Sequence, residues 1–388
     1  MANLLAFVGP SRGWGAEKRF HKILGYFPTF GVHTFALTTG ERLSQDDGSD
    51  SAAPKAKPTT FFLVLQGIRV VRKVPCDAVY VYHAERANCI VPSFIVSLIA
   101  RKPLFVVLHD DSKRSEDKLP FVTLLRANIQ GSPFPFAIAH TSVSLIRRMA
   151  VRWASACFCP SEFTAAYARG ILKARRVVVT GNGVDSFEPK PISTKKFEAV
   201  FVGRPDRGKG VDQLLLAWKQ VVQHIPGANL VIVGNTRSKS NEAELHLIIR
   251  SLELENNVIL TGYVDDDQVQ QYLRESRVFV FPSRREGFGL AVAEAMSAGL
   301  ACVISDIPAL REIFGDSAIL VPPEDHDALA SSVLRVLTDE KERSALELKG
   351  RELVRKMKWE DVAAREAQVI RGATRRERTG SEENDYRS

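Results

Sequence analysis

The most constraining feature of this sequence is an alternation of short, β-rich apolar runs with amphipathic, helix-like stretches, which occurs in two successive series. The first series has its apolar runs at residues 4–8, 34–37, 78–82, 104–108, 156–159 and 177–179. The second has them at residues 199–202, 229–233, 258–260, 278–281, 301–304 and 318–320. Strands that alternate with helices form parallel βαβ units. The pattern therefore predicts an α/β fold with two doubly wound, Rossmann-like parallel sheets.

The length of 388 residues agrees with two domains, because a single core stops growing near roughly 250–300 residues. Pro189 and Pro191, followed by a polar stretch, are typical of an interdomain connection. We expect an N-terminal domain over 1–188, a linker over 189–196, a C-terminal domain over 197–356 and a closing helix over 357–370 that crosses back to the N-terminal domain. Open parallel sheets bind ligands outside the carboxyl ends of their strands, so we expect the active site in a central cleft that both domains face.

Two polar segments are expected to lack regular structure. Residues 44–57 are small, polar and without periodicity, which predicts a flexible loop inside the first domain. Residues 371–388 are charged and nearly free of apolar side chains, which predicts a disordered tail.

From composition and the N-terminal residues we expect a cytoplasmic protein. Hydrophobic residues at 45% and charged residues at 25% are typical of a soluble globular chain. No apolar run reaches the roughly 18–20 residues of a membrane span, and the first apolar run lacks the preceding basic region of a signal peptide. The five cysteines are odd in number and scattered, which is unlike a disulfide framework. We expect Cys157 and Cys159 to pack in the core.

The net charge of +8 is unevenly distributed: residues 1–190 carry +11 and residues 191–388 carry −3. A basic half favours an anionic partner, although a solvated surface without a partner fits equally well. Residues 144–153 mix bulky apolar side chains with three arginines, as membrane-surface helices do. Alternatively, the apolar side chains pack inside the domain. The surface-helix interpretation would give peripheral contact with an anionic inner membrane surface. The chain has no recognised nucleic-acid reader pattern, so we expect no nucleic-acid partner.

The strongest chemical signal is the strand, glycine loop and helix over residues 281–299. Gly287 and Gly289 let a ligand approach the backbone, and unpaired N–H groups of the first helical turn attract an anionic group. Glu286 and Glu294 lie eight residues apart, so one carboxylate can meet the reacting end of a ligand while the other accepts hydrogen bonds from vicinal hydroxyls. The alternative is that Glu286 caps the helix and Glu294 pairs with a surface base.

A second strand, loop and helix follows at residues 202–211. Arg204 and Lys209 flank its turn with two cations, and the helix opening at Val211 adds the positive end of its dipole. This arrangement suits a pyrophosphate. The loop alone is weak support for such a site, and the glutamate-containing loop in the same domain strengthens the interpretation.

The first domain offers a glycine loop at residues 9–15 and a polar pair at His109 and Asp110. The loop lacks the complete G-x-G-x-x-G pattern, which disfavours a conventional NAD site. His109 follows an apolar strand, where an imidazole can donate a hydrogen bond to a sugar hydroxyl. The alternative is an imidazole that stabilises the loop.

Together these segments resemble glycosyltransferase family 4, the retaining nucleotide-sugar transferases with the GT-B fold. The stretch from Glu286 to Glu294 resembles the E-x7-E signature of that family, and residues 203–212 resemble its phosphate loop. Residues 181–185 and 358–362 resemble the segments before its linker and at the start of its closing helix.

The resemblance implies a role for each matched residue. Arg204 and Lys209 would hold the donor diphosphate. Glu294 would bind the ribose hydroxyls, and Glu286 would contact the transferring sugar. The backbone of the donor loop and three first-domain residues would complete the site: Gly287, Phe288, Gly289, Leu290, His109, Gly13 and Gly15. The chain departs from the family at residues 306–310, where many members have paired glycines, and at the inserted-looking Arg12 and Trp14.

We therefore expect a retaining, metal-independent transferase that moves a sugar from a nucleoside diphosphate to a hydroxyl acceptor. The run Asp265 to Asp267 superficially offers a metal-binding D-x-D pair, but helix capping explains it better, and two cations already neutralise the diphosphate. The nucleotide sugar is a co-substrate and no cofactor is expected. Two alternatives are a nucleotide-sugar epimerase or hydrolase of the same fold, and a noncatalytic nucleotide-sugar-binding scaffold.

Overall fold

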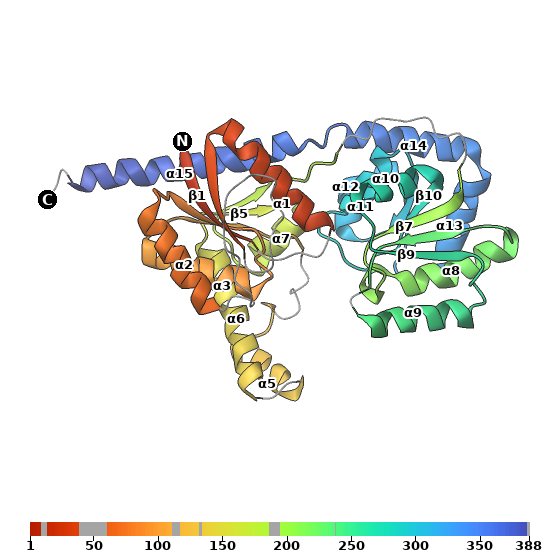
Figure 1. Ribbon diagram of the computed structural model, residues 1–388, viewed down its shortest axis with the longest axis horizontal. Helices are drawn as coiled ribbons and strands as arrows, with labels where there is room; N and C mark the ends of the chain where they lie inside the picture. Colours follow the sequence, from red (N-terminus) through yellow and green to blue (C-terminus); the bar gives the residue numbers. More distant parts are fainter. Residues whose placement is uncertain are drawn as a thin grey trace. The chain divides into compact units, whose positions relative to one another are not determined.

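The computed structural model describes residues 1–8, 14–38, 60–110, 117–131, 134–185, 195–236 and 238–385. These residues form two compact units, shown in Figure 1. Unit 1 comprises Met1–Gly181 and Trp359–Ser388, and unit 2 comprises Asn182–Lys358. The segment expected to be a flexible loop, residues 44–57, and most of the expected linker lie outside the described residues.

Unit 1 contains a six-stranded parallel sheet with the strand order β2-β1-β3-β4-β5-β6. Its strands are β1 (Ala2–Val8), β2 (Val32–Thr38), β3 (Ala78–Val81), β4 (Leu104–Val107), β5 (Ala156–Cys159) and β6 (Val177–Val179). Its helices are α1 (Trp14–Tyr26), η1 (Phe27–Phe30), α2 (Thr60–Lys73), α3 (Ala87–Ala100), α5 (Phe121–Gly131), α6 (Phe134–Trp153), α7 (Glu162–Gly170) and α15 (Trp359–Asp385).

Unit 2 contains a second six-stranded parallel sheet with the order β12-β11-β10-β7-β8-β9. Its strands are β7 (Phe197–Val202), β8 (Leu230–Val233), β9 (Val258–Gly262), β10 (Ser276–Phe281), β11 (Ala301–Ser305) and β12 (Ile319–Val321). Its helices are η2 (Arg207–Lys209), α8 (Val211–His224), α9 (Lys239–Ser251), α10 (Asp266–Glu275), α11 (Leu290–Ser297), α12 (Pro308–Phe314), η3 (Gly315–Ser317), α13 (His326–Thr338) and α14 (Glu340–Val354). The predicted fold class of two doubly wound sheets is confirmed.

The burial of the strands explains why apolar runs in the sequence predicted them. Every residue of β3, β4, β5 and β8 is buried, as expected for parallel strands that are covered by helices on both faces. Cys157 and Cys159 belong to β5, and the five cysteines are all free and buried. The prediction that these two residues pack in the core is confirmed.

The two units divide at Gly181 and Asn182, before the expected end of the first domain at residue 188. Residues 182–185 pack on unit 2 through two hydrogen bonds. The Val184 N–H donates to the Met357 carbonyl at 3.0 Å, and the Ser297 hydroxyl donates to the Asp185 carbonyl at 2.9 Å.

Helix α15 continues through residues 371–385, which are most of the segment expected to be a disordered tail. This helix packs within unit 1 against α1, η1 and β1. Once a helix is nucleated by such packing, each further residue adds one hydrogen bond at little cost, so a polar sequence can propagate it. Within the described part of the chain, no helix is both long enough and apolar enough to cross a membrane.

Candidate functional site

Two loops of unit 2 meet because the strands that precede them are neighbours. Strand β7 pairs in parallel with β10, with Ala199 opposite Val278. The loop after β7 leads into η2 and α8, and the loop after β10 leads into α11. Parallel strands end at the same edge of a sheet, so these loops occupy the edge where open sheets bind ligands.

The loops contact each other through their backbones. The Arg284 N–H donates to the Gly208 carbonyl at 3.1 Å. Gly210 adopts a φ of 71°, and a Cβ at this position would lie 1.9 Å from the Pro282 carbonyl oxygen. A residue with a side chain is therefore excluded here on two grounds, and the close approach fixes the relative position of the loops.

Replacing Gly210 by alanine should lower the free energy of unfolding by about 2 kcal/mol or more, because the new methyl group meets backbone atoms at a positive φ. Thermal unfolding measures the effect. Gly227→Ala is the matched control, since a Cβ at Gly227 meets no atom within 4 Å. Equal melting temperatures for the two variants would contradict the close packing of the loops.

The contact between the loops brings two predicted site residues together. The Lys209 ammonium forms an ion pair with Glu286 Oε1, which also accepts a hydrogen bond from the Ser283 hydroxyl at 2.8 Å. The same ammonium lies 5.4 Å from the centroid of the Phe281 ring. Glu286 is not the helix cap, because the N-cap of α11 is Gly289. The structure thus places a cation beside a carboxylate at the strand edge and removes the capping alternative for Glu286.

Arg204 has a different partner in this structure. Its Nε donates to Asp206 Oδ2 at 2.5 Å, and its side chain is 43% exposed. Asp206 is also the N-cap of η2, since its Oδ1 accepts from the Lys209 N–H at 3.1 Å. Arg204 therefore lies in the predicted loop without contacting Glu286.

Two further residues of the donor loop, Phe288 and Gly289, are buried and closely packed. Phe288 is 7% exposed and packs edge-on against Phe314, with ring centroids 6.0 Å apart. Gly289 has a φ of 92°, and a Cβ there would lie 2.6 Å from Leu310 Cδ2. Leu310 belongs to α12, which begins at Pro308 in the segment where the chain departs from the family pattern.

The other predicted donor-binding positions lie in the loop before α11 and on α11 itself. Leu290 is its first residue, and Gly287 lies between the Glu286 carboxylate and the Phe288 anchor. Glu294 follows in the second turn and is half-buried. The E-x7-E residues therefore lie on the loop and the helix that follow one strand.

Sequence reasoning missed a third cation, Arg284. Its guanidinium donates to both carboxylate oxygens of Asp212 at 2.7 and 2.8 Å and to Glu324 Oε2 at 2.7 Å, and it also bonds the Arg207 carbonyl. These hydrogen bonds raise the pKa of Arg284. Burial alone would raise the pKa of Asp212, but the hydrogen bonds from Arg284 lower it below its ordinary value. Arg284 thereby ties the start of α8 to the loop after β10. The sequence could have indicated a role for Arg284, because it lies two residues before Glu286.

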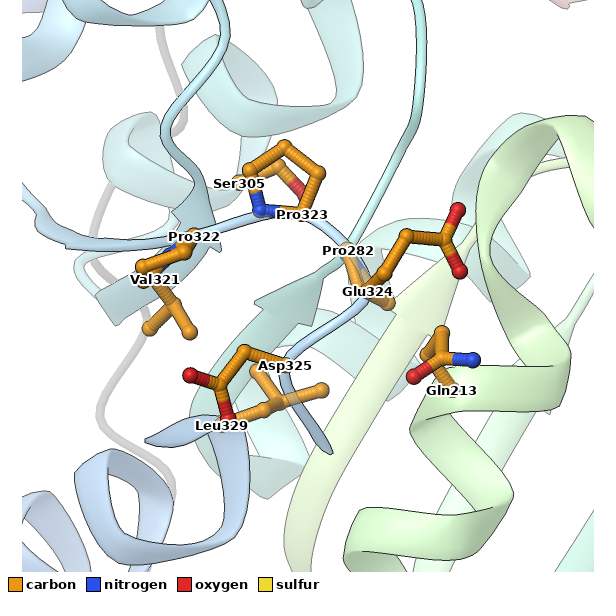
Figure 2. A pocket seen from close by; sticks show the side chains of 9 residues that line it. All are labelled: Gln213, Pro282, Ser305, Val321, Pro322, Pro323, Glu324, Asp325 and Leu329. Carbon is orange, nitrogen blue, oxygen red and sulfur yellow. The ribbon is translucent and has the colours of Figure 1, made fainter. Parts of the chain in front are cut away.

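The small pocket in Figure 2 lies beside this ion-pair network and is not the predicted donor site. Its lining comes from α8, α13 and the ends of β10, β11 and β12: Gln213, Pro282, Ser305, Val321, Pro322, Pro323, Glu324, Asp325 and Leu329. None of the residues predicted to bind a donor lines it.

The acidic run at Asp265 caps a helix, as the sequence predicted. Asp265 Oδ1 accepts from the Gln268 N–H at 2.8 Å, and Gln268 Oε1 accepts from the Asp265 N–H at 3.3 Å. This capping box begins α10 and accounts for Asp265, while Asp266 and Asp267 lie in the first turn.

In unit 1, His109 lies after β4, and its ring contacts the segment that follows β3. Its Nε2 lies 2.6 Å from the Tyr82 carbonyl, and its backbone N–H donates to Glu85 Oε1 at 2.8 Å. Burial lowers the pKa of His109 to about 3, so the imidazole is neutral near pH 7. Since Nε2 must donate to the carbonyl, Nδ1 carries no proton and is a hydrogen-bond acceptor. This geometry favours the loop-stabilising alternative, and a contact with sugar stays a prediction.

Glu85 and His83 surround His109 and were not predicted. Burial, with Asp110 nearby, raises the pKa of Glu85 from 4.5 to about 7. His83 is 5% exposed, and burial lowers its pKa to about 2. Their chain positions between β3 and α3 are typical of residues at the carboxyl edge of a sheet. Of the two predicted glycines of unit 1, Gly15 is the second residue of α1, and Gly13 lies outside the described residues.

Stability should fall as the pH rises through the titration of Glu85. Between pH 4.5 and about 7 the folded state keeps a proton that the unfolded state has lost, so the free energy of unfolding decreases with pH. Glu85→Gln mimics the protonated acid and should therefore raise the melting temperature at pH 8, with a smaller effect at pH 5. Melting curves at both pH values test this, with Glu162→Gln as the exposed control. A lower melting temperature for Glu85→Gln at pH 8 would contradict the raised pKa.

Comparison with known proteins agrees with this architecture. Residues 185–353 match the family model described as Glycosyl transferases group 1. The O-antigen chain mannosyltransferase B of Escherichia coli is 29% identical over 163 residues, which cover 42% of each chain. The phosphatidyl-myo-inositol mannosyltransferase of Mycolicibacterium smegmatis is 30% identical over 223 residues, which cover 52% of this chain and 56% of the relative. The chain thus matches about half of the length of these relatives.

Solved structures resemble the whole chain at low sequence identity. The sucrose-phosphate synthase of Thermosynechococcus elongatus superposes with a TM-score of 0.73 at 20% identity, over 96% of this chain and 99% of that one. HepE of Anabaena, in complex with UDP and glucose, gives a TM-score of 0.73 at 18% identity, over 96% and 100% of the two chains. These similarities establish the GT-B fold, and the family match supports a glycosyltransferase.

Proposed function

We propose that this chain is a retaining glycosyltransferase of family 4 that moves a sugar from a nucleoside diphosphate to a hydroxyl acceptor without a metal ion. The observation that carries the proposal is the pairing of Lys209 with Glu286 at the common edge of β7 and β10. This edge holds a cation for a phosphate, a carboxylate for a sugar hydroxyl and the amino end of α11.

Each donor group has a proposed partner in unit 2. The diphosphate is held by Lys209, by Arg204 after it leaves Asp206, and by backbone N–H groups at Gly289 and Leu290. Glu294 accepts hydrogen bonds from the ribose hydroxyls, and Glu286 accepts them from the transferring sugar. The binding of UDP and glucose by HepE, a protein of the same fold, supports a nucleotide-sugar donor.

The proposed chemistry depends on stabilising charge rather than on a protein base. As the bond between the anomeric carbon and the phosphate oxygen breaks, the sugar gains oxocarbenium character and the leaving diphosphate gains negative charge. Lys209 and the loop amides meet that charge from their positions in the structure, and Arg204 joins them once it has left Asp206. The acceptor hydroxyl attacks from the face the diphosphate leaves, and its proton passes to the leaving phosphate oxygen. The configuration at the anomeric carbon is retained.

Donor binding can be tested before the acceptor is known. UDP-glucose, GDP-mannose and ADP-glucose are added separately in thermal-shift measurements, because a ligand that binds only the folded state raises its stability by about 2.7 kcal/mol at 100 times Kd. We expect one of the three to raise the melting temperature, and the increase to persist in EDTA. A shift that vanishes in EDTA would contradict metal independence. No shift with any donor would contradict the site.

Product analysis then separates transfer from its alternatives. With the donor that binds, we expect the sugar on a hydroxyl acceptor with its anomeric configuration unchanged by NMR. A glycan, a lipid-linked sugar and a small glycoside should all be offered, since the relatives include an O-antigen chain mannosyltransferase and a phosphatidyl-myo-inositol mannosyltransferase. Free sugar as the main product would indicate a hydrolase. An altered sugar on the same nucleotide would indicate an epimerase, and donor binding without turnover would indicate a noncatalytic scaffold.

A further inference from the structure

Helices α5 and α6 form a hairpin within unit 1. They pack against each other, and the Asn128 side-chain amide donates to the Thr141 hydroxyl at 2.9 Å. Figure 1 shows α6 running away from the sheet, with α5 beside its distal end. The proximal half of α6 is fixed by Arg147, whose guanidinium pairs with buried Asp117 and donates to the Tyr167 hydroxyl at 3.2 Å. The hairpin therefore projects from unit 1 and is anchored to it by the buried contacts of Arg147.

The hairpin exposes large apolar side chains along one face of each helix. The exposed residues of α6 lie four or seven positions apart, which places them on one face: Phe134 (59% exposed), Ile138 (40%), Leu145 (42%), Met149 (43%) and Trp153 (57%). On α5, Val122 and Ile129 lie seven positions apart and are 58% and 41% exposed. The sequence left open whether the apolar residues of 144–153 pack inside the domain. Ile146, Ala150 and Val151 do pack in the core, whereas Leu145, Met149 and Trp153 are exposed.

The charge of the hairpin has a single sign. Residues 121–153 contain four arginines and no aspartate or glutamate. Arg126 lies four positions after Val122 and three before Ile129, and Arg152 lies three positions after Met149, so both share the apolar faces. Neither has an ion-pair partner among the residues that the structure describes. Arg175 adds a third cation beside this face, with its guanidinium 5.3 Å from the Trp153 ring centroid.

We propose that the α5–α6 hairpin docks on the surface of an anionic lipid bilayer. The exposed apolar side chains enter the boundary between headgroups and acyl chains, and Arg126, Arg152 and Arg175 contact lipid phosphates. A bilayer is favoured over a protein partner for two reasons. Residues 121–153 carry arginines and no acidic residue, which complements a surface of uniform negative charge, and bulky apolar and cationic side chains share the faces of the two helices. The proposal does not rest on sugar transfer. It adds to the proposed function a location where a lipid-linked acceptor would be within reach.

The test is co-sedimentation of the full-length protein with phosphatidylcholine vesicles that contain or lack phosphatidylglycerol. We expect binding to the anionic vesicles that weakens as salt is added. Each arginine near the surface contributes about five-fold to such binding, so Arg126→Gln with Arg152→Gln should weaken it about 30-fold. The triple variant Phe134→Ser, Ile138→Ser and Trp153→Ser should weaken it more than ten-fold.

The matched control is Leu247→Ser with Leu348→Ser in unit 2, where the side chains are 66% and 59% exposed. This control should bind as the unaltered protein does, and all variants should keep its melting temperature. Failure of the unaltered protein to bind anionic vesicles would overturn the proposal, as would equal binding by the hairpin variants. A concentration-dependent dimer that the triple variant abolishes, without lipid binding, would instead identify the face as a contact between copies of the chain. Donor thermal shifts should be the same in all these variants, so failure here is distinguishable from failure of the transferase assignment.

Discussion

Replacing Lys209 by alanine should lower kcat/KM with the donor that binds by about 10²–10³, which is the effect of removing one preorganised group that stabilises a developing anion. In the structure, the ammonium is paired with Glu286 and held over the Phe281 ring. Its loss removes a positive charge where the diphosphate is expected and leaves the Glu286 carboxylate facing it. Both effects act in the same direction. Initial rates of sugar release or transfer measure them.

The control for this variant is Arg207→Ala. Arg207 lies in the same short helix and its side chain is exposed, so its removal changes the net charge by the same amount without touching the ion pair. Glu286→Gln tests the other partner. It keeps an oxygen that can accept from Ser283 but loses the carboxylate, and we expect a fall in kcat. Unchanged turnover in both Lys209→Ala and Glu286→Gln would refute the assigned site.

Replacing Glu366 by alanine should destabilise unit 1 by about 3–5 kcal/mol, the usual effect of leaving a buried charge without its partner. Glu366 is fully buried on α15. It accepts from Arg19 at 2.5 Å and from the Tyr80 hydroxyl at 2.7 Å. Arg19 on α1 is 1% exposed and also donates to the Thr180 hydroxyl at 3.3 Å. The alanine variant strands the Arg19 guanidinium inside the protein.

Urea unfolding of the alanine variant, compared with Glu360→Ala on the exposed side of the same helix, measures this effect. The double variant Arg19→Met and Glu366→Leu should recover much of the stability, because it removes both charges and keeps side-chain volume. A loss below about 1 kcal/mol for Glu366→Ala, which is typical of exposed pairs, would show that the pair is not buried in solution.

The strands were predictable because parallel strands covered on both faces read as continuous apolar runs, as in β4 and β5. Helix α14 was not predicted, because its buried face carries little apolar signal. Arg343 is buried there and donates to the Val336 and Leu337 carbonyls, and Gly350 brings the helix against Met296. Val354 is the one apolar residue among the three buried positions of α14, so apolar periodicity gives little indication of this face.

The sequence predicts the two loops of the candidate site, but it does not predict the contact between them. Lys209 and Glu286 belong to different motifs, and they meet only because β10 lies beside β7 in the sheet. That strand order follows from how successive crossovers wind, which the alternating pattern does not specify. The same limit explains why the bonds of Arg284 to Asp212 and Glu324 were missed, since these residues lie on three separate connections.

Unit 1 is built from two separate segments of the chain, and the ribosome makes the second segment only after all of unit 2. The sheet of unit 1 is complete once Gly181 has been made, yet Arg19 lacks its carboxylate partner until Glu366 on α15 appears. At about 5–20 residues per second, the intervening roughly 180 residues take the ribosome roughly 10–40 s. All of unit 2 is translated in that interval and can fold without waiting. Unit 1 therefore acquires the carboxylate partner of its buried Arg19 only after all of unit 2 has been translated.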